Sequence, residues 1–177
     1  MKFVVFLTLA AASLSAEPGI TKNGSWIYQF DEDGMGRPRQ TIWTYSTNQL
    51  NFGFPYQGAQ TGRLSLRTVE HGQDIMLSIE HGQFLCGFPG CLVNVRFDEG
   101  KIEHFCASRA SDGSSTVLFL SNKSAIWSYS DGRWDCSNMF MRASFLPKLH
   151  KAKRIRIEAE FFHEGMQTLD FEVDGLK

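Results

Sequence analysis

Polar and apolar residues alternate along most of the chain after residue 24, and this period of two is typical of β-strands with one buried face. The first such segment, GSWIYQF at residues 24–30, places three aromatic side chains on one face. The expected strands are residues 24–30, 40–47, 63–69, 75–85, 92–97, 101–107, 116–120, 154–162 and 167–173. Turn residues separate most of these segments, which predicts antiparallel hairpins.

One segment has the residue spacing of a helix rather than a strand. In residues 144–152 (SFLPKLHKA), Ser144 can cap the first turn and Pro147 is tolerated within it. Phe145, Leu146 and Leu149 give one apolar face. Eight to ten strands and one short helix near the C-terminus predict an all-β fold, an antiparallel two-sheet β-sandwich.

The centre of the chain is expected to be a hairpin closed by a disulfide. Residues 75–85 and 92–97 are rich in strand-forming residues, and the Gly-Phe-Pro-Gly turn at 87–90 separates them. Cys86 and Cys91 flank this turn, and opposed Cα atoms beside a short turn lie within the range that a disulfide tolerates. The sequence therefore predicts a Cys86–Cys91 disulfide.

The other two cysteines, Cys106 and Cys136, are then left to pair with each other. A structural zinc site is the alternative, but such sites usually place cysteines two to four residues apart, whereas these are scattered. We expect two disulfides and no metal.

The N-terminus has the layout of a secretory signal peptide. Residues 1–16 (MKFVVFLTLAAASLSA) begin with one basic residue, continue as an apolar run and end in small residues, with cleavage plausible after Ser15 or Ala16. A membrane anchor is disfavoured because the run of about 12 residues is shorter than the ~20 that a span needs. Residues 17–177 are then expected to form a single domain in a periplasmic or secreted protein.

Charge and hydropathy exclude several classes of partner. The net charge is −1, from 18 basic and 19 acidic residues, so no electrostatic attraction to nucleic acid is expected. No later stretch approaches the length of a transmembrane helix, and no phosphate-binding or cofactor motif occurs. We expect no cofactor and no integral membrane segment in the mature chain.

Two loops concentrate aromatic residues among glycines, prolines and polar residues. The candidates for a binding surface are Phe52, Phe54 and Tyr56 in residues 49–62, and Trp127, Tyr129 and Trp134 in residues 121–139. Exposed aromatic side chains dominate many recognition surfaces. The alternative is that these rings cover the core from irregular edge segments.

Catalytic patterns are sparse. There is no nucleophile elbow and no His-Glu-x-x-His motif, and the four cysteines are better explained by disulfides. Glu-His-Gly-Gln occurs twice, at 70–73 and 80–83, and an envelope hydrolase would draw its acid and base from Glu80, His81 and Glu158. These residues fall where a turn, a bulge or a solvated strand face explains them, so no enzyme is expected.

Short motifs in residues 74–176 support one resemblance. Val95 to Asp98 reads Val-Arg-Phe-Asp, residues 112–116 precede an apolar strand, and the last strand reads Phe171-Glu-Val-Asp-Gly-Leu176. This order resembles small periplasmic β-sandwich accessory proteins of type VI secretion systems. The resemblance implies a sandwich fold and a non-enzymatic accessory role, and it carries over no catalytic residue.

Together these patterns predict an exported, non-enzymatic interaction module. It would bind a protein partner or a cell-envelope component through the aromatic loops. A small-ligand or carbohydrate-binding protein is the main alternative, because tryptophan and tyrosine rings stack on sugars, and an envelope hydrolase is the third.

Overall fold

The computed structural model describes residues 19–70, 72–88, 90–128, 133–135 and 144–177. Within these ranges the chain forms fourteen strands and one helix. They are β1 (Gly19–Asn23), β2 (Trp26–Glu32), β3 (Pro38–Tyr45), β4 (Leu50–Phe52), β5 (Gly58–Gln60), β6 (Gly62–Val69), β7 (Gly72–Ile79), β8 (Cys91–Phe97), β9 (Ile102–Arg109), β10 (Val117–Ser124), β11 (Ile126–Ser128), β12 (Arg133–Asp135), α1 (Phe145–Leu149), β13 (Arg154–Phe161) and β14 (Gly165–Glu172). The predicted signal peptide, residues 1–16, lies outside the described residues.

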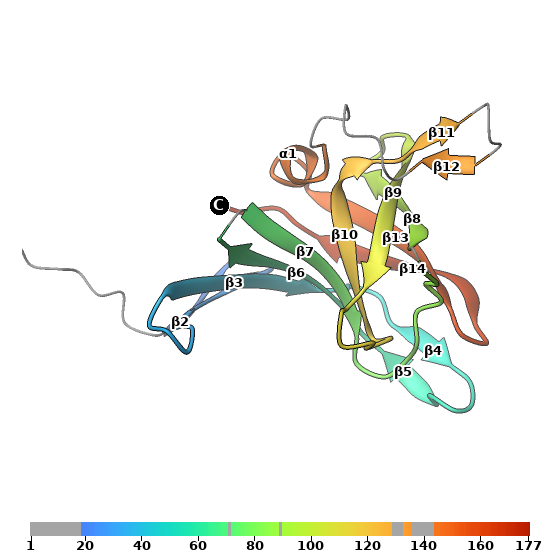
Figure 1. The fold of residues 1–177 in the computed structure, drawn as a ribbon, viewed down its shortest axis with the longest axis horizontal. Helices are drawn as coiled ribbons and strands as arrows, with labels where there is room; N and C mark the ends of the chain where they lie inside the picture. Colours follow the sequence, from blue (N-terminus) through green and yellow to red (C-terminus); the bar gives the residue numbers. More distant parts are fainter. Residues whose placement is uncertain (1–18, 71, 89, 129–132, 136–143) are drawn as a thin grey trace, which may run out of the picture.

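Ten strands form a single antiparallel sheet in the order β1-β2-β3-β6-β7-β10-β9-β8-β13-β14 (Figure 1). The short hairpins β4–β5 and β11–β12 make two further two-stranded sheets among the described residues. The expected antiparallel all-β architecture with one short helix is confirmed. The strands expected to divide between two sheets are instead hydrogen-bonded into one, because β10 joins β7 to β9 and β8 joins β9 to β13.

The large sheet curves so that one of its faces encloses the core. In nine strands of this sheet alternate residues are buried on this face, as Leu77 of β7 and Ile157 of β13 illustrate; the nine are β2, β3, β6, β7, β8, β9, β10, β13 and β14. Each such side chain contributes roughly 1.5–3 kcal/mol when fully buried. The curvature brings β14 beside β3, and the Trp26 indole Nε1 of β2 donates a hydrogen bond at 2.8 Å to the carbonyl oxygen of Val173, the residue after β14.

Helix α1 covers one end of the core. Phe145 and Leu149 are fully buried, and the Phe145 ring lies 5.5 Å from that of Phe97 and 5.2 Å from that of Phe105. The predicted cap is wrong, because the Ser144 side chain makes no capping hydrogen bond. Asn122 replaces it from β10, with its Oδ1 accepting a hydrogen bond from the Leu146 amide at 2.9 Å.

The predicted central hairpin is also wrong. Strand β7 ends at Ile79 and pairs with β6 and β10, whereas β8 pairs with β9 and β13. The described part of residues 80–90 crosses between them because Phe84 is drawn into the core, where its ring lies 4.5 Å from that of Phe161. A Cβ at Gly82 would lie 2.7 Å from Cε2 of Phe52, so this position needs glycine.

The first predicted disulfide is confirmed even though its strands do not pair. The Sγ atoms of Cys86 and Cys91 lie 2.11 Å apart, and their Cα atoms are separated by 4.9 Å. Cys136 lies outside the described residues, so the Cys106–Cys136 pair stays a prediction. No helix in the described ranges has both the length and the apolar character required to cross a membrane.

Candidate interaction surface

The structure separates the three aromatic residues predicted in the first loop. Phe52 is 6% exposed and packs on Phe161 with ring centroids 5.1 Å apart, so it belongs to the core. Tyr56 is half-buried against the core, and its hydroxyl donates a hydrogen bond to Oε1 of Gln83 at 3.2 Å. Phe54 is 81% exposed. Only Phe54 therefore keeps the exposure expected of a binding residue in this loop.

The second loop contains the small hairpin β11–β12. Trp127 and Trp134 lie directly opposite each other in its register. Tyr129 lies outside the described residues. The assignment of these three residues to a binding surface stays a prediction.

Three segments far apart in sequence meet at the end of the molecule that carries the β4–β5 hairpin (Figure 1). They are the β4–β5 turn, the crossover at residues 80–90 and the β13–β14 turn. The amide of Gly53 donates a hydrogen bond to Oε1 of Glu164 at 2.7 Å, which joins the first segment to the third. The Leu85 amide donates to the Glu160 carbonyl oxygen, and the Phe162 amide to that of Gln83, both at 2.8 Å. These contacts hold the three segments together.

The three segments expose apolar side chains at this end of the molecule. The loop-end surface comprises Phe54, Leu85, Phe88, Phe162 and Met166, with exposed fractions of 81, 37, 103, 36 and 48%. Phe88 has the largest exposed fraction, although its loop is closed by the Cys86–Cys91 disulfide.

Sequence reasoning missed four of these five residues. One signal was available for Phe88, because an aromatic residue between glycine and proline inside a cysteine-closed loop has no strand face to bury it. Leu85, Phe162 and Met166 continue strand-like patterns in the sequence, and only the pairing of the crossover with β13 shows which of their faces is outward.

Carboxylates surround the loop-end surface. Glu80 and Glu160 are exposed, and Glu164 is half-buried beside Gly53. Neither the crossover nor residues 53–57 or 160–166 contain a lysine or an arginine. Arg109 at the end of β9 lies two residues beyond Ala107, which pairs with Cys91, so one basic residue also approaches this end. The three glutamates outnumber it, whereas the whole chain is nearly neutral.

The proposed acid and base residues are not gathered into a catalytic arrangement. Glu80 and His81 lie exposed on the crossover, whereas Glu158 lies on the outer face of β13 and accepts a hydrogen bond from Asn94 Nδ2 at 2.6 Å. Asn94 Oδ1 lies 2.7 Å from Nδ1 of His104. Within the described ranges, no hydrogen bond or ion pair joins Glu158 to Glu80 or His81, and no three His, Cys, Asp or Glu side chains are grouped as metal ligands would be.

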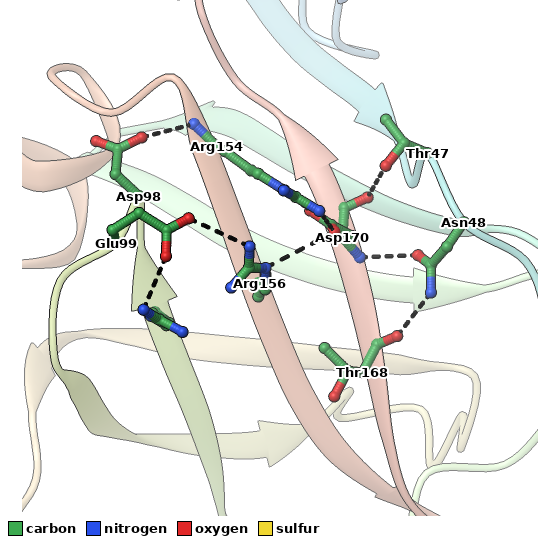
Figure 2. A network of polar contacts seen from close by, with 9 residues as sticks. Thr47, Asn48, Asp98, Glu99, Arg154, Arg156, Thr168 and Asp170 are labelled. Carbon is green, nitrogen blue, oxygen red and sulfur yellow. Dashed lines mark hydrogen bonds and ion pairs between the residues drawn. The ribbon is translucent and has the colours of Figure 1, made fainter.

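A second polar cluster closes the curved sheet (Figure 2). Asp170 of β14 forms an ion pair with Arg154, and the Arg154 Nε donates to Asp170 Oδ1 at 2.6 Å. This hydrogen bonding raises the pKa of Arg154. The Asn48 side chain donates to the Thr168 carbonyl oxygen at 2.8 Å and accepts from the Asp170 amide at 2.9 Å. The Thr47 amide adds a hydrogen bond to the Asp170 carbonyl oxygen at 2.7 Å.

These contacts give the cluster a structural role. They pair the free edge of β14 with the segment that follows β3, as a neighbouring strand would. Arg156 extends the cluster toward β8, with its Nη2 3.4 Å from Oε1 of Glu99. The charged side chains of this face thus pair with one another, whereas Glu80 and Glu160 beside the loop-end surface are exposed.

Compared with known protein families, with curated proteins and with solved structures, the chain matches none.

Proposed function

We propose that this protein is an exported, non-enzymatic interaction module that binds a protein partner through the loop-end surface. The observation that carries the proposal is the complete exposure of Phe88 on a loop closed by a disulfide. A large apolar side chain held in water is unfavourable for the isolated protein, and exposed apolar groups of this kind mark sites of interaction.

The way in which the surface is held favours binding. Association costs free energy when loops and side chains become ordered, and a loop already constrained loses less. The disulfide constrains the segment of Phe88, and the Gly53–Glu164 hydrogen bond constrains the turn that carries Phe54. Aromatic anchors on such a support are typical of residues that contribute most of the binding energy.

Charge indicates the chemistry of the partner. Glu80, Glu160 and Glu164 border the surface without a basic residue in the same segments. The complementary partner presents apolar side chains flanked by lysine or arginine. The predicted signal peptide, together with the resemblance of residues 74–176 to type VI secretion accessory proteins, makes a cell-envelope protein the first partner to test.

The experiment compares three forms of the mature, oxidised protein as baits in an envelope extract of the host. They are the wild type, a Phe54→Ala/Phe88→Ala variant and an Ile102→Ala control, since Ile102 is 62% exposed on β9 and lies outside the loop-end surface. We expect the wild type and the control to retain a partner that the double variant loses.

The captured partner is then purified and its affinity is measured directly. Loss of two anchor residues is expected to weaken binding at least 30-fold, which corresponds to about 2 kcal/mol. A partner retained equally by the double variant, or no specific partner for correctly folded wild type, would show that the loop-end surface is not the binding site.

A further inference from the structure

A polar cavity lies at the opposite ends of β3 and β6 from the loop-end surface. It has a volume of about 560 Å³ and is formed where the β2–β3 turn approaches the end of β6. Its polar lining consists of Asp33, Arg37, Arg39, Arg67, Thr68 and Glu70. This volume lies within the range of roughly 300–1,000 Å³ that is usual for small-molecule sites.

Carboxylates hold the three guanidinium groups of the cavity in place. Arg37 Nε donates to Asp33 Oδ2 at 2.7 Å. Arg39 donates to both oxygens of Asp31 at 2.8 Å.

Arg67 is fixed in the same manner by Asp74, and its guanidinium carbon also lies 5.9 Å from the centre of the Phe119 ring. A guanidinium has five N–H groups, and these carboxylates engage one or two of them in each arginine. Each arginine therefore keeps at least three further donors in a fixed orientation for other acceptors.

The ion pairs also balance the charge of the cavity. Hydrogen bonding to Arg39 lowers the pKa of the Asp31 carboxyl, and backbone amides of Arg37 and Met35 lower that of Asp33. Both aspartates are therefore ionised at neutral pH. Since Asp74 and Glu70 add two more carboxylates, the three arginines give the cavity no excess of positive charge that would attract an anion.

Acceptors are available beside these donors. Thr68 and Glu70 are exposed at the end of β6, and neither side chain makes a hydrogen bond within the part of the chain that the structure describes. Pro38 and Val69 add small apolar surfaces to the lining. The cavity thus offers oriented donors, a hydroxyl, a carboxylate and apolar patches within one concave site.

We propose that this cavity binds a neutral saccharide. Each sugar hydroxyl both donates and accepts, so neighbouring hydroxyls match the arginine donors and the Glu70 carboxylate, and the C–H face of the ring can lie on Pro38 or Val69. An anion would meet Glu70 and the paired aspartates, and an apolar ligand would remove water from the arginine donors that it covers without replacing those hydrogen bonds. The site is independent of the loop-end surface.

The test is a two-dimensional amide NMR titration of the oxidised protein with maltose, cellobiose and chitobiose. Each sugar is added to about 10 mM, which is tenfold above a weak dissociation constant of about 1 mM. At least one sugar is expected to shift the amide signals of residues 33–39 and 67–70. Absence of shifts in both segments with all three sugars would overturn the proposal.

Variants and anionic ligands test the role of Glu70 and the preference for neutral sugars. Glu70→Gln should weaken binding about fivefold, because a hydrogen bond to a charged carboxylate is replaced by one to a neutral amide oxygen, while Glu172→Gln on β14 should leave it unchanged. Shifts with glucuronate or inorganic phosphate, but with no neutral sugar, would refute the assignment to neutral ligands. The Phe54→Ala/Phe88→Ala variant should bind sugar as the wild type does. A negative result for partner binding at the loop-end surface would therefore leave the saccharide proposal for the cavity intact.

Discussion

Replacing Asn48 by alanine tests how the curved sheet is closed. The Asn48 side chain makes two hydrogen bonds to β14, one to the Thr168 carbonyl oxygen at 2.8 Å and one from the Asp170 amide at 2.9 Å. A typical intramolecular hydrogen bond contributes about 0.5–1.5 kcal/mol, and water can reach the exposed Thr168 group after the change. We therefore expect Asn48→Ala to lower the free energy of unfolding by about 1.5 kcal/mol.

Urea unfolding followed by tryptophan fluorescence measures this loss. With a urea dependence of roughly 2 kcal/mol per molar, the midpoint should fall by about 0.7 M while the slope stays unchanged. Asn51→Ala is the matched control, because Asn51 is exposed in β4 and its side chain makes no hydrogen bond in the part of the chain that the structure describes. If the two variants had the same midpoint, the Asn48 contacts would not stabilise the closure and the argument would be refuted.

Three further predictions concern the core, the disulfide and pH. Phe52→Ala should cost about 3–5 kcal/mol in calorimetric or urea unfolding, since Phe52 is buried, and a loss below 1 kcal/mol would contradict its place in the core. Cys86→Ser/Cys91→Ser should lower stability by about 2 kcal/mol, and an unchanged urea midpoint would count against the chain-entropy estimate. Hydrogen bonding to Arg39 holds the pKa of Asp31 below its ordinary 3.8. The stabilisation of the folded state by the Asp31–Arg39 pair is therefore present above pH 3.8 and is lost as the pH falls through the lowered pKa. Arg39→Gln should therefore make unfolding stability less dependent on pH below about 4, and an unchanged pH profile would exclude this contribution.

Local sequence patterns predicted the strands and one disulfide correctly where neighbouring residues decide the outcome. The alternation at residues 154–162 and 167–173 corresponds to β13 and β14, which pair through the short turn between them. Cys86 and Cys91 are close in sequence, and the chain between them can bring them to bonding distance whether or not their flanks form a ladder. The predicted disulfide is therefore confirmed, although the hairpin from which it was predicted does not form.

The same patterns failed where a distant segment competes for a residue. Residues 75–85 read as one strand, but Phe84 packs on Phe161 and the strand ends at Ile79. Phe52 and Phe54 are two residues apart in a single aromatic loop, and only the position of Phe161 shows that the first is buried. The residues flanking Phe84 and Phe52 in the sequence do not indicate that either ring packs on Phe161.

The sequence by itself determined the period of two, the turns, the near balance of charge and the pairing of cysteines that lie close together. These properties depend on backbone geometry and on side-chain chemistry over a few residues. Only the tertiary structure decided that ten strands share one sheet, that Phe54 and Phe88 are exposed at the same end, and that Arg37, Arg39 and Arg67 line one cavity. The physical reason is that burial and charge pairing depend on which distant segments meet, and the hydrophobic effect that brings them together has no direction.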